Sequence, residues 1–80
     1  MQRVLLTGWE RGLRKVSLAR LLQERAGLSL ATAKGLVDRC LAGEIMTVEL
    51  ASIEDAEALV REAGRLGATA ELDRVARRPS

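Results

Sequence analysis

The run GLSLATAK, residues 27–34, decides the fold of this 80-residue chain. Gly27 suits the left-handed conformation that ends a helix, and Ser29 suits the position that caps the start of the next helix. Apolar residues recur at helical spacing on both sides of the run. We therefore expect two consecutive helices, from about residue 13 to 26 and from about residue 30 to 41, joined by a tight turn.

Three further segments have the composition of β-strands. Residues 3–7 and 45–50 are short and rich in aliphatic or β-branched side chains, and residues 68 to about 75 begin with alternating apolar and polar side chains. Gly8 is expected to end the first of these strands. One strand therefore precedes the helical pair, and two strands follow it.

A third helix is predicted between the last two strands. Ser52 and Asp55 form a capping pair, apolar residues then recur at helical spacing, and Gly67 ends the pattern. The order β-α-α-β-α-β predicts an α+β fold, a two-layer sandwich in which three helices cover one face of a three-stranded antiparallel or mixed sheet. We expect a single domain over residues 1–75 and a disordered tail over residues 76–80.

The composition favours binding over catalysis. The chain has no His, one Cys and one aromatic residue, Trp9. A histidine-based zinc site, an imidazole-dependent catalytic triad and an internal disulfide are therefore excluded. Cys40 falls near the predicted core face of the second helix, which indicates a buried structural thiol. We expect no catalytic residues, no metal site and no cofactor.

The location and charge of the chain also favour a binding module. No apolar run approaches the roughly 18 residues of a membrane span, and the first residues lack the pattern of a signal peptide, so we expect a cytoplasmic protein with no membrane contact. The net charge of +2 divides unevenly, because residues 1–39 carry +5 and residues 40–80 carry −3. The positive charge thus gathers on the first strand and the helical pair.

The first predicted helix has an apolar inner face and a basic outer face. On a helical wheel Leu18, Leu21 and Leu22 form the inner face, and Val16 falls nearly opposite. An exposed apolar residue ringed by cations suits an acidic or amphipathic partner, although isolated exposed apolar residues also occur on ordinary solvated surfaces. The predicted partner-binding residues lie on the outward sides of the two helices: Lys15, Val16, Ala19, Arg20, Gln23 and Lys34.

The helical pair carries a signature that consists of Lys15-Val16, Arg20, Gly27-Leu28-Ser29-Leu30, Ala33-Lys34 and Leu36-Val37. With the later runs at residues 55–59 and 67–68, it resembles the C-terminal domain of the bacterial ribosomal stalk protein over about residues 3–74. That family has the β-α-α-β-α-β fold, and its domain binds translational GTPases and helps recruit them to the ribosome. The resemblance implies such a partner and contact through Lys15, Val16, Arg20 and Lys34.

The chain departs from the stalk family in several places. It has Ala19 where the family usually has a larger aliphatic residue, and Gln23 where the family has Arg. Arg25 falls on the inner side of the wheel and so cannot replace that charge on the outer face. The dimerisation segment and hinge of the family are not in this sequence, so we expect a stand-alone module and not a complete stalk protein.

A protease adaptor of the same fold is one alternative. The spacing between residues 37 and 52 is closer to that of the adaptor of the Clp protease, and residues 27–30 also fit that family. Residues 7–9, however, replace the adaptor's Asn-Asp pair, and a chain without His lacks its pocket histidine. Recognition of N-terminal degradation signals by the usual residues is therefore not expected.

Two other hypotheses are binding to DNA and binding to a second copy of the chain. Residues 20–41 have the layout of a helix-turn-helix, with residues 45–50 as a wing. The outward residues of its second helix, Ala31, Gly35 and Asp38, are poor readers of base edges, which argues against nucleic-acid binding. The surface around Val16 equally suits a homodimer contact.

Overall fold

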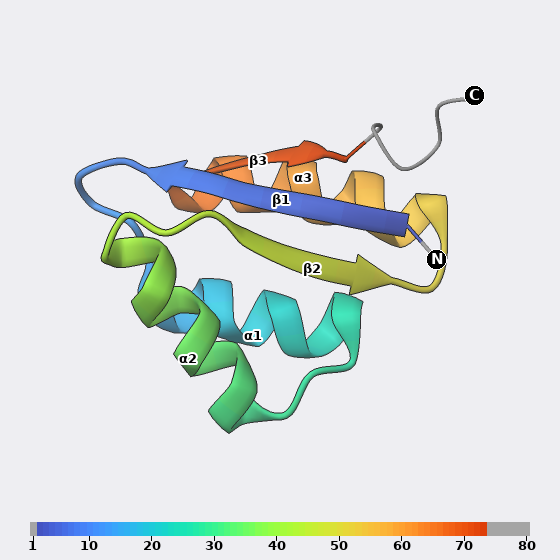
Figure 1. Ribbon diagram of the computed structural model, residues 1–80, viewed down its shortest axis with the longest axis horizontal. Helices are drawn as coiled ribbons and strands as arrows, with labels where there is room; N and C mark the ends of the chain where they lie inside the picture. The colour runs from blue at the N-terminus through green and yellow to red at the C-terminus, as the bar shows by residue number, and fades with distance from the viewer. Residues whose placement is uncertain (1, 74–80) are drawn as a thin grey trace.

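A three-stranded antiparallel sheet in the order β2-β1-β3 organises the computed structural model of this chain (Figure 1). The structure describes residues 2–73. Strand β1 (Gln2–Trp9) is central and pairs with both β2 (Met46–Leu50) and β3 (Ala68–Leu72). The α+β class and the predicted order of elements are confirmed. The tail predicted over residues 76–80 lies outside the described residues.

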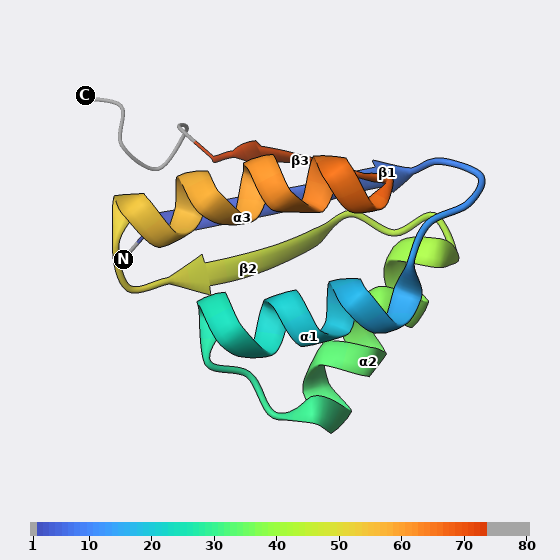
Figure 2. The same ribbon diagram turned by 180° about the vertical axis from the view of Figure 1, so that it is seen from behind.

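Three helices cover one face of this sheet. They are α1 (Lys15–Ala26), α2 (Leu30–Leu41) and α3 (Ile53–Leu66). Figure 2 shows α3 in front of β1 and β3, with α1 and α2 beside it toward β2. None of the helices in residues 2–73 is long and apolar enough to cross a membrane.

The helix ends follow the chemistry of their capping residues. Gly27 ends α1 in the left-handed conformation with a φ of 70°, and the Ser29 Oγ accepts a hydrogen bond from the Thr32 amide at the start of α2. Helix α1 begins later than the predicted residue 13. There the amide of Leu13 donates to Glu10 in a turn and the amide of Arg14 donates to Leu66, so neither residue has joined the helix.

The core is aliphatic, as expected for a chain with one aromatic residue. Strand residues alternate, so that Val4 and Leu6 are fully buried while Arg3 lies on the open face of the sheet. Burial of each full-size aliphatic side chain is worth about 1.5–3 kcal/mol. The largest fully buried side chains come from both layers: Val4, Leu6, Leu18, Leu22, Cys40, Leu50 and Leu59.

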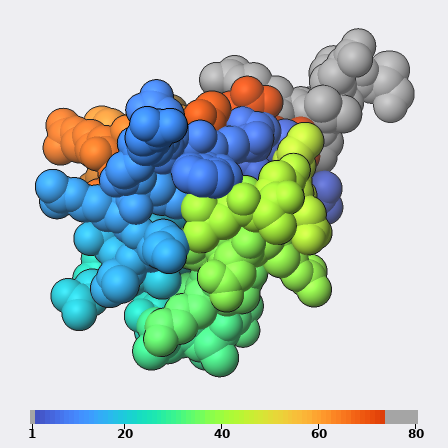
Figure 3. Space-filling model, turned by 90° about the vertical axis from the view of Figure 1, so that its left-hand side faces the viewer, coloured from blue at the N-terminus to red at the C-terminus, as the bar shows by residue number. Residues whose placement is uncertain are grey.

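A β-bulge at the end of β1 turns Trp9 toward the helices. Leu6 is paired with Ala70, yet Trp9 is paired with Ala68, because the register shifts by one residue between Leu6 and Gly8. The prediction that Gly8 ends the strand is therefore wrong. The bulge brings Trp9 to the face that carries Ala68, near Leu41 of α2, where 44% of its surface stays exposed. Figure 3 shows this end of the molecule, with the β1–α1 connection beside α2.

Candidate protein-binding groove

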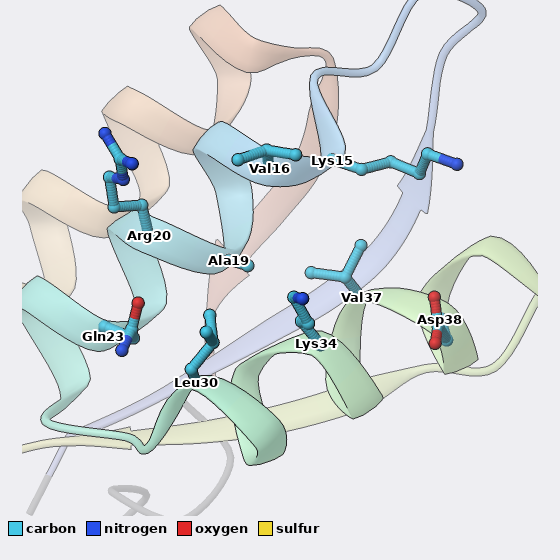
Figure 4. Close-up of a pocket in the computed structure, with 9 residues that line it drawn as sticks. All are labelled: Lys15, Val16, Ala19, Arg20, Gln23, Leu30, Lys34, Val37 and Asp38. Carbon is cyan, nitrogen blue, oxygen red and sulfur yellow. The ribbon is translucent and has the colours of Figure 1, made fainter.

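Helices α1 and α2 enclose a surface groove of about 390 Å³. We call it the α1–α2 groove. It contains every residue predicted to bind a partner, together with three residues of α2 that the sequence did not single out for this role (Figure 4). The lining residues are Lys15, Val16, Ala19, Arg20, Gln23, Leu30, Lys34, Val37 and Asp38. Six positions chosen from helical periodicity and family resemblance thus lie around one depression.

Two small or medium apolar side chains form the floor of the groove. Ala19 and Val37 are each 3% exposed and belong to the hydrophobic core. The helical wheel places Ala19 on the exposed side of α1, and that prediction is wrong. The wheel treats a helix in isolation, whereas in the folded chain α2 packs across this side of α1 and covers Ala19. Ala19 lines the groove as part of its base and not as part of its rim.

The apolar centre of the groove is open to solvent. Val16 is 73% exposed and Leu30 is 48% exposed, which makes them two of the most exposed large apolar side chains among residues 2–73. Leu30 was not predicted as a site residue. It stands seven residues before Val37, and this spacing puts it on the same helix face as the groove floor. That spacing is the signal in the sequence that could have identified it.

Three cations line the groove beside this apolar centre. The side chains of Lys15, Arg20 and Lys34 are exposed, and within residues 2–73 none of them makes an ion pair. Figure 4 shows Lys34 between the positions of Leu30 and Asp38 along α2. Asp38 is the only carboxylate among the lining residues. The groove therefore presents a positive rim to a partner.

The third cation of α1, Arg25, belongs to a different contact. The Arg25 guanidinium lies 3.1 Å from a Glu62 carboxylate oxygen and 3.5 Å from one of Asp55, both on α3. The hydrogen bond and charge of Glu62, aided by Asp55, raise the pKa of Arg25 above its ordinary value. This position agrees with the prediction that Arg25 faces inward. It ties α1 to α3 and adds nothing to the groove.

Cys40 lies on the core side of α2, away from the groove. It is 1% exposed, and its Sγ donates to the Gly8 carbonyl at 3.8 Å. Burial raises the pKa of the thiol above its ordinary value. The prediction of a buried thiol is confirmed. Residues 2–73 hold no group of three or more Cys, Asp or Glu side chains that could bind a metal ion.

The pairing of strand β2 argues against the helix-turn-helix alternative. Strand β2 is an edge strand that pairs with β1 along its whole length, from Met46 against Leu6 to Leu50 against Gln2. It is not one arm of a β-hairpin, so the segment expected as a wing does not project from the molecule.

Comparison with models of protein families and with curated protein sequences gives no match. The α1–α2 groove is therefore the feature on which a function can be based.

Proposed function

We propose that this chain is a protein-binding module that holds an acidic, apolar segment of a partner protein in the α1–α2 groove. The observation that carries the proposal is the exposed pair Val16 and Leu30 beside three cations that make no ion pair within residues 2–73. A docked partner would remove both aliphatic side chains from water, at about 25 cal/mol per Å² of apolar surface. The rim would favour carboxylates beside the apolar anchor and would speed association at low salt.

The resemblance to the ribosomal stalk domain supports a partner class. The positions of Lys15, Val16, Arg20 and Lys34 match the contact positions of that family, and all four line the groove. We therefore propose a translational GTPase, or the ribosome itself, as the partner, and a cytoplasmic location. The module contributes binding alone, with no catalytic step and no cofactor. The buried Ala19 matches the family less well, since a larger aliphatic side chain there would raise the groove floor.

The test is an affinity measurement with a purified bacterial translational GTPase. We expect Lys15→Glu combined with Arg20→Glu to weaken binding by about tenfold or more, because two favourable charge contacts become repulsive. Raising the salt concentration from about 0.05 M to 0.5 M should weaken binding of the wild-type chain, because exposed charges are screened over shorter distances.

The matched control reverses two arginines away from the groove. Arg3→Glu with Arg61→Glu changes the net charge equally, and both side chains are exposed outside the lining of the groove, on the open face of the sheet and on α3 respectively. This control should bind like wild type. Equal affinity of the Lys15/Arg20 variant and the wild type would overturn the groove as the binding site. Absence of any binding by the wild type would overturn the translational GTPase as the partner.

A further inference from the structure

The chain carries an acidic, apolar segment of its own at the first turn of α3. Ile53 is 37% exposed, and Glu54 and Glu57 are exposed beside it. Within residues 2–73 neither glutamate makes an ion pair. Asp55, on the same turn, is held by Arg25 instead. The free side of this turn therefore has one apolar side chain and two unpaired carboxylates.

The spacing on α3 groups these three side chains together. Ile53 and Glu57 are four residues apart, and Glu54 and Glu57 are three residues apart, so each pair are neighbours on the helix surface. The α1–α2 groove has the reverse arrangement, an apolar centre with unpaired cations around it. The two surfaces are complementary in both charge and polarity.

Charge also excludes the simplest dimer. A two-fold contact of groove with groove would bring Lys15, Arg20 and Lys34 of one copy against the same cations of the other. Like charges at an interface are unfavourable. A second copy that occupies the groove is therefore expected to present a different surface, and the first turn of α3, with Glu54 and Glu57 exposed beside Ile53, fits it in charge.

We propose that the α1–α2 groove of one copy binds the first turn of α3 of a second copy, head to tail. Figure 1 places the start of α3 and helix α2 at opposite ends of the molecule, so one copy cannot join its own two surfaces. A head-to-tail pair leaves one groove and one α3 turn free, so further copies can add as concentration rises, in an open chain or a ring. The inference rests on the proposed function because it uses the same groove, and it names one competitor for the partner.

Two charge-reversal variants test this contact. The groove variant carries Lys15→Glu and Arg20→Glu, and the helix variant carries Glu54→Lys and Glu57→Lys. Sedimentation velocity at about 0.05 M salt should show the wild type associating at concentrations on the order of 0.1–1 mM, while each variant alone stays monomeric. An equimolar mixture should associate again, because the intact groove of the helix variant can hold the intact α3 turn of the groove variant.

Controls separate charge pairing from other effects. Glu44→Lys with Glu71→Lys changes the net charge as the helix variant does, at exposed positions outside both surfaces. This control should associate like wild type. Reversed charges at the start of α3 also oppose the helix dipole, so Glu54→Gln with Glu57→Gln serves as a milder variant. It should fold, as judged by circular dichroism, and should also associate more weakly than wild type.

Each outcome has a definite meaning. A wild type that remains monomeric at 1 mM, or a mixture of the two variants that does not associate, overturns the head-to-tail contact. Self-association of the groove variant overturns it as well, since the groove is then not required. The helix variant keeps an intact groove and should bind the translational GTPase like wild type. Its binding therefore tests the proposed function separately from self-association.

Discussion

The two flanks of helix α1 differ in whether their cations form ion pairs within the chain. On the flank toward α3, Arg25 is paired with two carboxylates of the same chain, so this flank is electrostatically closed. On the flank toward α2, Lys15 and Arg20 line a groove and have no ion-pair partner within residues 2–73. One helix thus contributes both an internal clamp and an open surface.

The difference shows why counting charges does not locate a binding surface. Arg20 and Arg25 are five residues apart on the same helix and carry the same charge. The packing of α3 places two carboxylates against Arg25, whereas Arg20 lines both the α1–α2 groove and a hollow toward α3 without an ion pair in residues 2–73. The cations available to a partner are those that the fold leaves without carboxylates of its own.

The largest effect on stability is expected from the core residue Leu22, which packs beneath both flanks of α1. Leu22 is fully buried beneath α1 and belongs to the core. Leu22→Ala removes that packing and should lower the free energy of unfolding by about 2–5 kcal/mol. Urea denaturation followed by circular dichroism measures this change. A loss below about 1 kcal/mol would mean that the site collapses around the smaller side chain.

A smaller effect is expected at the junction between α1 and α3. Gly67 has a φ of 101°, and a Cβ there would lie 3.1 Å from the Leu13 Cα. Gly67→Ala should therefore cost about 1–2 kcal/mol of stability from the left-handed conformation, and more from the contact with Leu13.

The matched control is another glycine of the same helix. Gly64 lies within α3, has no positive φ, and has nothing within 4 Å of an added Cβ. Gly64→Ala should stabilise the chain by about 0.5–1 kcal/mol, because alanine has the higher helix propensity. The two substitutions should have opposite signs in urea denaturation, and equal signs would contradict the structure at this junction.

The ion pairs of Arg25 on the flank toward α3 should make a modest, salt-dependent contribution to stability. Arg25→Gln removes the guanidinium that pairs with Asp55 and Glu62, so the urea midpoint should fall. The decrease should be larger at low salt than at about 1 M salt, because these partly exposed charges are screened. Arg20→Gln is the control on the open flank and should leave the midpoint unchanged. If both substitutions shift it equally, the two flanks do not differ.

The smallest effect on stability is expected in the groove itself. Val16 is 73% exposed, so Val16→Ser should change the free energy of unfolding by no more than about 0.5 kcal/mol. The same substitution should weaken partner binding several-fold, because it removes apolar surface from the centre of the groove. Isothermal titration calorimetry with the translational GTPase gives this affinity. Unchanged binding would show that the partner contacts the rim alone.

The sequence predicts elements and local faces well, because caps and periodicity act over a few residues. Ser29 and Gly27 set the turn between α1 and α2, and the second helix spans residues 30–41 as expected. Predictions failed where distant segments meet. The bulge that carries β1 past Gly8 depends on its pairing with β3.

The groove was predicted in part for the same reason. Val16 could be placed on the surface from the wheel alone, and the structure leaves it exposed. Ala19 could not, because its burial depends on how α2 crosses α1. The spacing between Leu30 and Val37 indicates a shared helix face, but the partial exposure of Leu30 depends on how α1 and α2 pack. Helical spacing predicts direction, and only tertiary packing decides which outward side chains share a hollow.

The bulge in β1 has an optical consequence. Because Trp9 is the one aromatic residue of the chain, the intrinsic fluorescence of the protein comes from a single indole. The hollow beside Trp9 is lined by Lys15, which also lines the α1–α2 groove. We expect a ligand that draws the Lys15 ammonium toward the groove to change the polarity around that indole and hence its emission. The unlabelled protein thus carries its own spectroscopic reporter of groove occupancy.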